Sequence, residues 1–81
     1  MARVTLYGKP GCHLCDDARA VVLEARAERR FDLEEVDVSI DADLNRRYGE
    51  RIPVVFLDGE ELFEHFVDPV VLRERLDRVG A

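Results

Sequence analysis

The chain has 81 residues, of which 47% are hydrophobic and 37% charged, and its formal net charge at pH 7 is −6. This composition is typical of one small globular domain, here spanning residues 1–81, and excludes a disordered chain. The acidic balance argues against nucleic acid as a partner. No apolar run reaches the length of a membrane span, and we expect no signal peptide, because Met1-Ala2-Arg3 leads directly into the first predicted strand. We therefore expect a cytoplasmic monomer that has no contact with a membrane.

The first predicted elements are a strand and a long helix. Residues 4–7, Val-Thr-Leu-Tyr, form a largely apolar run that suits a buried strand. A Lys-Pro-Gly turn then ends this pattern. The apolar residues that follow recur at helical spacing and predict a helix over residues 13–28, with acids early and arginines late, as the helix dipole favours. The expected buried stripe consists of Leu14, Ala18, Val21, Val22 and Ala25.

The second predicted strand, residues 31–38, has an irregular pattern. Phe31 and Leu33 alternate as in a half-buried strand, whereas Val36 and Val38 are out of phase with them. Either the strand begins late, or a bulge shifts its register. This irregularity and the charged residues within the segment favour an edge strand over a central one.

The second half of the chain predicts a short helix, a hairpin and a final helix. Turn and cap residues precede a short helix over residues 42–48. An Asp-Gly pair between residues 54–57 and 60–66 is a strong hairpin signal. Asp68 and Pro69 open the last helix as its N-cap and first residue. Its expected buried stripe consists of Leu72, Leu76 and Val79. The order is β-α-β-α-β-β-α, with a parallel first βαβ unit and an antiparallel hairpin.

The two cysteines of the chain, Cys12 and Cys15, form a C-x-x-C motif between the first strand and the first helix. Residues three apart share a helix face, so their sulfurs can close a disulfide or face one ligand. Cys12 precedes the helix, where unpaired N–H groups and the helix dipole favour a thiolate. No further cysteine is left for a structural disulfide. The pair therefore fits a reducing compartment and indicates catalysis or metal binding.

Two motifs of the chain resemble those of glutaredoxins, in the same order and on the same elements. They read Lys9-Pro10-x-Cys12-x-x-Cys15 and Ile52-Pro53-x-Val55-Phe56. The Cys-His-Leu-Cys form is similar to that of a subgroup of small glutaredoxin-like proteins. The resemblance implies an α/β fold of the thioredoxin type, with a four-stranded mixed sheet in the order 2-1-3-4 flanked by helices. It also implies a cis peptide bond before Pro53.

The resemblance also implies roles for individual residues. Cys12 would be the thiolate that attacks a substrate disulfide, and Cys15 the resolving thiol. Lys9 would lie near the thiolate, and the backbone of Ile52, followed by Pro53, would pair with the substrate as a short strand.

Four further residues bear on substrate recognition. His13 lies beside the nucleophile and is a candidate for tuning its redox behaviour, and Arg51 is a candidate contact for a substrate carboxylate. Phe63 and Glu64 stand where glutaredoxins usually carry two glycines beside glutathione. Glutathione is therefore expected to be a poor reductant, and a flavoenzyme reductase is the alternative. No tightly bound cofactor is expected.

These observations favour a thiol–disulfide oxidoreductase that reduces a protein disulfide or a small-molecule disulfide. Metal binding is the main alternative, because thiolates suit Cu(I) and metal chaperones also place a C-x-x-C between a strand and a helix. Such chaperones end in a strand, whereas this chain is predicted to end in a helix. A third alternative is a non-catalytic binding module of the thioredoxin fold, or a protein that bridges an iron–sulfur cluster through Cys12.

Overall fold

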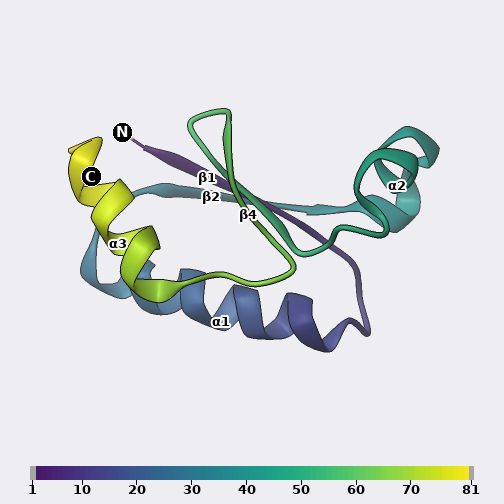
Figure 1. Ribbon diagram of the computed structural model, residues 1–81, viewed down its shortest axis with the longest axis horizontal. Coiled ribbons are helices and arrows are strands. Elements are labelled where there is room, and N and C mark those ends of the chain that lie inside the picture. Colours follow the sequence, from purple (N-terminus) through teal and green to yellow (C-terminus); the bar gives the residue numbers. More distant parts are fainter. Residues whose placement is uncertain (1, 81) are drawn as a thin grey trace.

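The computed structural model describes residues 2–80, and within them the predicted order of strands and helices is confirmed (Figure 1). The strands are β1 (Arg3–Gly8), β2 (Asp32–Asp37), β3 (Val54–Leu57) and β4 (Glu60–Glu64). The helices are α1 (His13–Glu28), α2 (Ala42–Tyr48) and α3 (Pro69–Arg78), and a short 3₁₀ helix, η1 (Val38–Ile40), precedes α2. None of the helices within residues 2–80 is both long and apolar enough to cross a membrane.

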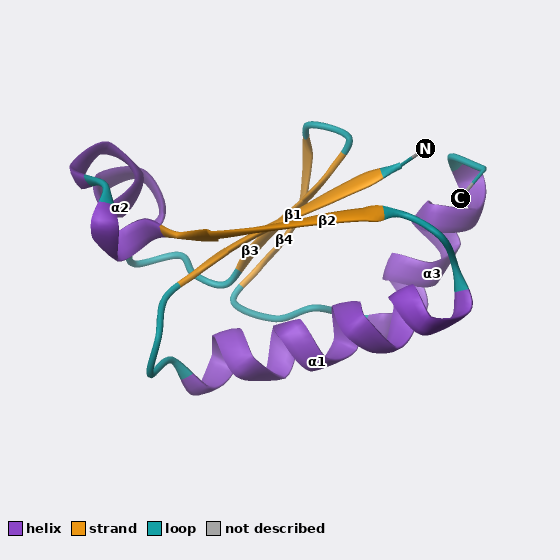
Figure 2. Ribbon diagram, turned by 180° about the vertical axis from the view of Figure 1, so that it is seen from behind, coloured by secondary structure: helices purple, strands orange, loops and turns teal. Residues whose placement is uncertain are grey.

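The four strands form one mixed sheet in the order β2-β1-β3-β4, which confirms the predicted topology. β1 pairs with β2 in parallel and with β3 antiparallel, and β3 and β4 form the hairpin. α1 and α3 cover one face of the sheet, and α2 lies at the end where β2 stops (Figure 2). β2 is thus an edge strand, as its charges predicted.

Alternation along the central strands builds the core. Val4 and Leu6 of β1 point toward the helices and are 0% and 4% exposed. They pack in one cluster with Val22 of α1 and with Leu72 and Leu76 of α3. Side-chain alternation along a strand requires the residues between them to face the other side. This packing fixes the N-terminus of α1 beside the C-terminal end of β1, where the two cysteines lie.

The predicted buried stripes are wrong at two helix ends. Leu14 is 52% exposed, because the buried face of α1 begins one residue later, at Cys15, and continues at Ala18 and Val22 with helical spacing. Val79 is 47% exposed, because it is the C-cap of α3 and its backbone has left the helical region.

The second strand begins one residue later than predicted and contains no bulge, so Leu33 and Val36 lie in one regular strand and face its opposite sides. β2 starts at Asp32, and its pairing with β1 runs without a register shift from Arg3 to Gly8. Phe31 precedes the strand and is buried in the core.

The register shift of this sheet lies in the hairpin instead. Val55 pairs with Phe63, but the next residue, Phe56, pairs with Glu61, so Leu62 is an extra residue in β4. A bulge of this kind changes which side chains share a face of the strand. β4 ends at Glu64, two residues before the predicted end at residue 66.

Candidate active site

Cys12 is the N-cap residue of α1 and uses its sulfur where most helices use an oxygen. Its backbone is extended, and its Sγ accepts a hydrogen bond from the backbone N–H of Cys15 at 3.2 Å. The carbonyl of Cys12 accepts the first helical bond, from the N–H of Asp16 at 3.0 Å. The sulfur is half-buried and lies at the positive end of the helix, where a backbone donor can hold negative charge.

Cys15 lies behind Cys12 and is only 7% exposed. It packs against the end of β1, where a Cβ on Gly8 would lie 3.2 Å from both the Cβ and the Sγ of Cys15. The missing side chain of Gly8 therefore makes room for this thiol. Burial, the contact with Cys12 and the nearby charge of Asp16 raise the pKa of Cys15 to about 11. Both cysteines are free thiols in this structure, and Cys15 is protonated at neutral pH.

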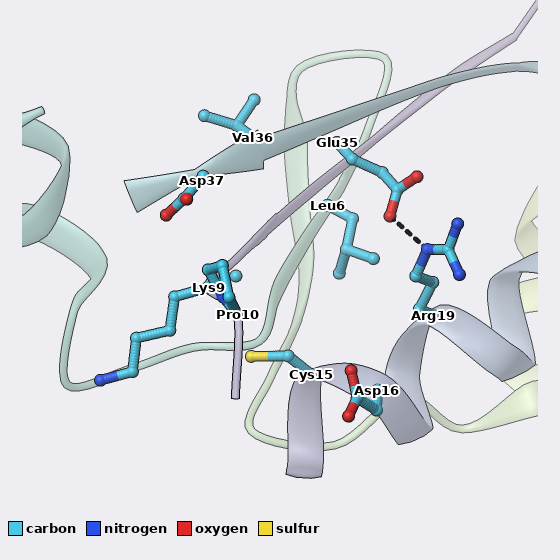
Figure 3. A pocket seen from close by; sticks show the side chains of 10 residues that line it. Leu6, Lys9, Pro10, Cys15, Asp16, Arg19, Glu35, Val36 and Asp37 are labelled. Atoms are coloured by element: carbon cyan, nitrogen blue, oxygen red, sulfur yellow. Dashed lines mark hydrogen bonds and ion pairs between the residues drawn. The ribbon is translucent and has the colours of Figure 1, made fainter. Parts of the chain in front are cut away.

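A pocket of about 280 Å³, here called the rear pocket, opens on the inner side of Cys15 (Figure 3). It lies between the end of β1, the first turns of α1 and the edge strand β2. Arg19 of α1 and Glu35 of β2 line it and form an ion pair at 2.6 Å. Lys9 also lines the pocket, and its side chain extends away from the sulfur of Cys15. The rear pocket thus borders the buried Cys15 on the side of β2.

The structure brings the turn before β3 to the two cysteines. Ile52 is 7% exposed and packs in one cluster with Cys15 and Val38, and Cys12 packs against the same cluster. The Ile52–Pro53 peptide bond is cis, the isomer that the resemblance implied. The carbonyl of Pro53 accepts a hydrogen bond from the N–H of His65 at 2.8 Å, which ties this turn to the end of β4. The two cysteines and the turn of Ile52 and Pro53 thus lie together at one place on the molecule.

Arg51 is occupied by contacts within the chain. Its Nε donates to Glu64 at 2.7 Å, its Nη2 donates to Glu61 at 2.5 Å, and its guanidinium lies 5.5 Å from the ring centre of Tyr48. The two carboxylates raise the pKa of Arg51 further above its ordinary range, and Arg51 lowers the pKa of Glu64. His13, the first residue of α1, is exposed.

Sequence reasoning missed the two glutamates as partners of Arg51, because residues 61 and 64 should face opposite sides of a regular strand. The bulge at Leu62 removes one step of the alternation, so Glu61 and Glu64 stand beside Phe56 and Val54 on the same face. No local sequence signal marks this bulge. Gly8 was missed as well, although a glycine that ends a strand just before a C-x-x-C is a sign of close packing.

The sheet order and the position of the C-x-x-C before α1 define a protein of the thioredoxin fold class. A mutant thioredoxin from Halobacterium salinarum matches the fold with a TM-score of 0.73, over 99% of this chain and 75% of that one, at 21% identity.

The family to which the chain belongs is shown by matches of higher sequence identity. The model of the glutaredoxin-like domain (DUF836) matches residues 3–77, and the chain belongs to this family. The structural genomics target XcR50 from X. campestris is 38% identical, with a TM-score of 0.77 over 93% of this chain and 96% of that one. The glutaredoxin-like protein YDR286C homolog of Dictyostelium discoideum is 32% identical over 80% of this chain. The match spans 66% of the length of that protein, just under two thirds.

Proposed function

We propose that this protein is a thiol–disulfide oxidoreductase with Cys12 as nucleophile and Cys15 as resolving thiol. The supporting observation is the difference between the two thiols. Cys12 is half-buried at the N-terminus of α1 and has a backbone donor on its sulfur, whereas Cys15 is buried and protonated. Exchange chemistry needs an accessible thiolate for the first attack and a second thiol within reach for the second.

The proposed reaction has two exchange steps. The thiolate of Cys12 attacks one sulfur of a substrate disulfide, forms a mixed disulfide and releases the first substrate thiolate. Cys15 then loses its proton to solvent and attacks the Sγ of Cys12. The Cys12–Cys15 disulfide closes, and the second substrate thiolate leaves. Two electrons pass from the protein dithiol to the substrate, and glutathione or a flavoenzyme reductase returns them.

The turn of Ile52 and Pro53 is proposed to dock the substrate beside Cys12. An extended substrate segment would pair with the backbone of Ile52, as in other strand-addition complexes. Lys9 and His13 are proposed to flank the substrate on the side of α1, Lys9 as a cation and His13 as a polar contact.

Metal binding by Cys12 and Cys15 is the competing function. Residues 2–80 contain no group of three or more His, Cys, Asp or Glu side chains placed to hold one ion. A tetrahedral ion on these two thiols would need two further ligands, which solvent or a second molecule could supply.

Serine variants of the two cysteines test the proposal, with insulin as a protein disulfide substrate. Cys12→Ser is expected to abolish reduction of insulin. Cys15→Ser is expected to retain the first attack and to accumulate a mixed disulfide on Cys12, visible by mass spectrometry. The proposal fails if Cys12→Ser still reduces insulin. It also fails if the native protein reduces nothing and carries a metal that both variants lose.

A further inference from the structure

Arg51, Glu61 and Glu64 form a cluster of ion pairs beside the turn of Ile52, here called the Arg51 clamp. Arg51 reaches Glu61 at 2.5 Å and Glu64 at 2.7 Å. The three side chains are between 37% and 46% exposed, so the clamp lies at the surface. One cation shared by two carboxylates leaves an excess of negative charge.

The clamp borders the proposed docking turn. Arg51 precedes Ile52 directly and lies over the ring of Tyr48. Ile52 belongs to the cluster against which Tyr48 and Cys12 both pack. A substrate that pairs with the backbone of Ile52 would therefore lie beside Arg51, the preceding residue.

The contacts within the Arg51 clamp affect which substrate charge is favoured beside Ile52. Arg51 donates its Nε and Nη2 to Glu64 and Glu61 in short charge-assisted hydrogen bonds, so a substrate carboxylate that reached its other N–H groups would lie close to both glutamates. Both glutamates would then repel the substrate. The N-terminal part of α1 adds two exposed carboxylates, Asp16 and Asp17, whereas Lys9 adds one cation before the helix.

We propose that the Arg51 clamp is a specificity determinant that disfavours anionic disulfides and favours neutral and cationic ones. The inference rests on the proposed function and adds the class of substrate. Glu61 and Glu64 act by occupying Arg51 and by supplying negative charge, and they take no part in the exchange of sulfurs. Because the clamp is partly exposed, each charge change should alter rates by roughly 3- to 10-fold at low salt.

The test uses three small disulfides of similar size and different charge. These are dithiodiglycolate, which is dianionic, bis(2-hydroxyethyl) disulfide, which is neutral, and cystamine, which is dicationic. The fully reduced protein is mixed with each disulfide in excess, and the loss of free thiols is followed by acid quenching and mass spectrometry. Each rate is divided by the rate of a neutral free thiol with the same disulfide, which removes the intrinsic reactivity of the probe.

Variants with opposite expected effects separate charge selection from loss of structure. Glu64→Gln and Glu61→Gln each remove one negative charge and one ion pair of Arg51. In both variants the rate with dithiodiglycolate, divided by the rate with cystamine, should be higher than in the native protein. Arg51→Met leaves both carboxylates unpaired and should change that ratio in the opposite direction. The matched control is Glu60→Gln, the same charge change in the same strand. Glu60 lies at the far end of β4, where it pairs with Arg75 at 2.5 Å, and its loss should leave the ratio unchanged.

Each outcome has a distinct meaning. The inference is supported by two results together. The normalised rates of the native protein rise from the dianionic to the dicationic disulfide, and the two glutamine variants change the ratio of these rates in one direction while Arg51→Met changes it in the other. It is overturned if the native series is flat, if each variant changes all three rates by one factor, or if Glu60→Gln shifts the ratio equally. If none of the three disulfides oxidises the native protein, the proposed function itself has failed.

Discussion

At the scale of single residues, burial separates two cysteines that are chemically identical in the sequence. Cys15 is 7% exposed and Cys12 is half-buried, although only two residues lie between them. Burial penalises the charged form of a thiol, and the contact with Cys12 adds to this effect at Cys15. Gly8 keeps the inner thiol close to β1, so that it lies behind the outer one.

The raised pKa of Cys15 predicts a steep pH dependence of its alkylation. With a pKa of about 11, roughly one Cys15 in a thousand is a thiolate at pH 8. Iodoacetamide at pH 8 should therefore modify Cys12 first. The alkylation rate of Cys15 should rise about tenfold for each pH unit up to about pH 10, because the thiolate is the reactive form. Peptide mapping of protein quenched at several times measures both rates.

Protein unfolded in urea is the control, since both cysteines should then react alike. A rate for Cys15 that levels off below about pH 9, or equals that of Cys12 at pH 8, would contradict this prediction.

Residue positions in the site were predictable where local sequence determines them. Cys12 and Cys15 lie after a strand, at the start of a helix, and Ile52 and Pro53 directly precede another strand. Their proximity therefore follows from the order of the strands in the sheet. The partners of Arg51 depend on a bulge at Leu62, which arises from how β4 pairs with β3. Such a pairing is a long-range property that no local pattern records.

At the scale of elements, sequence signals located helix starts more reliably than buried faces. The starts of α1 and α3 were predicted to the residue, because cap chemistry is local. The buried face of α1 was wrong at Leu14, because helical spacing alone allows a stripe to begin at Leu14 or at Cys15. Contacts with the sheet decide between the two, and they are not local.

The cap of α3 gives a prediction at this scale. The carboxylate of Asp68 accepts hydrogen bonds from the N–H groups of Val70 at 2.9 Å and Val71 at 3.3 Å. Asp68→Ala should lower the free energy of unfolding by about 1 kcal/mol, because these two donors lose their partner. Urea denaturation followed by circular dichroism measures the loss.

Asp68→Asn is the matched control, since an asparagine oxygen caps a helix nearly as well. The rate at which Cys12 attacks a disulfide should be the same in both variants, because α3 lies away from the C-x-x-C (Figure 1). Equal stability of the alanine variant and the native protein would show that the cap contributes nothing.

At the scale of the whole molecule, ion pairs at the surface join elements that are distant in sequence. Arg29 at the end of α1 binds Asp77 of α3 at 2.7 Å, and Arg73 of α3 binds Glu28 of α1 at 2.8 Å. Exposed pairs contribute little individually. Together they make stability depend on pH, because the arginines lower the pKa values of Glu28 and Asp77, as Arg51 does for Glu64.

These shifts predict that stability falls at both ends of the pH range. A carboxylate whose pKa is lower in the folded state contributes stability above its ordinary value, 4.5 for Glu28 and Glu64 and 3.8 for Asp77. That contribution is lost as the pH falls through the folded pKa. Cys15 has the opposite sign. Its pKa rises from an ordinary 9.0 to about 11, so its contribution is complete below pH 9 and is lost as the pH rises toward 11.

The urea midpoint should therefore be nearly constant from about pH 5 to about pH 8 and decrease on either side. Added salt separates the effect of the ion pairs at acid pH from the effect of burial at alkaline pH. About 0.5 M sodium chloride screens exposed ion pairs and should flatten the acid limb, while the alkaline limb, which comes from the pKa values of Cys15 and Tyr7 that burial raises, should persist. Cys15→Ser should remove part of the alkaline limb and leave the acid limb unchanged. A midpoint that rises on acidification below about pH 4 would mean that these carboxylates are not stabilised by their arginines in solution.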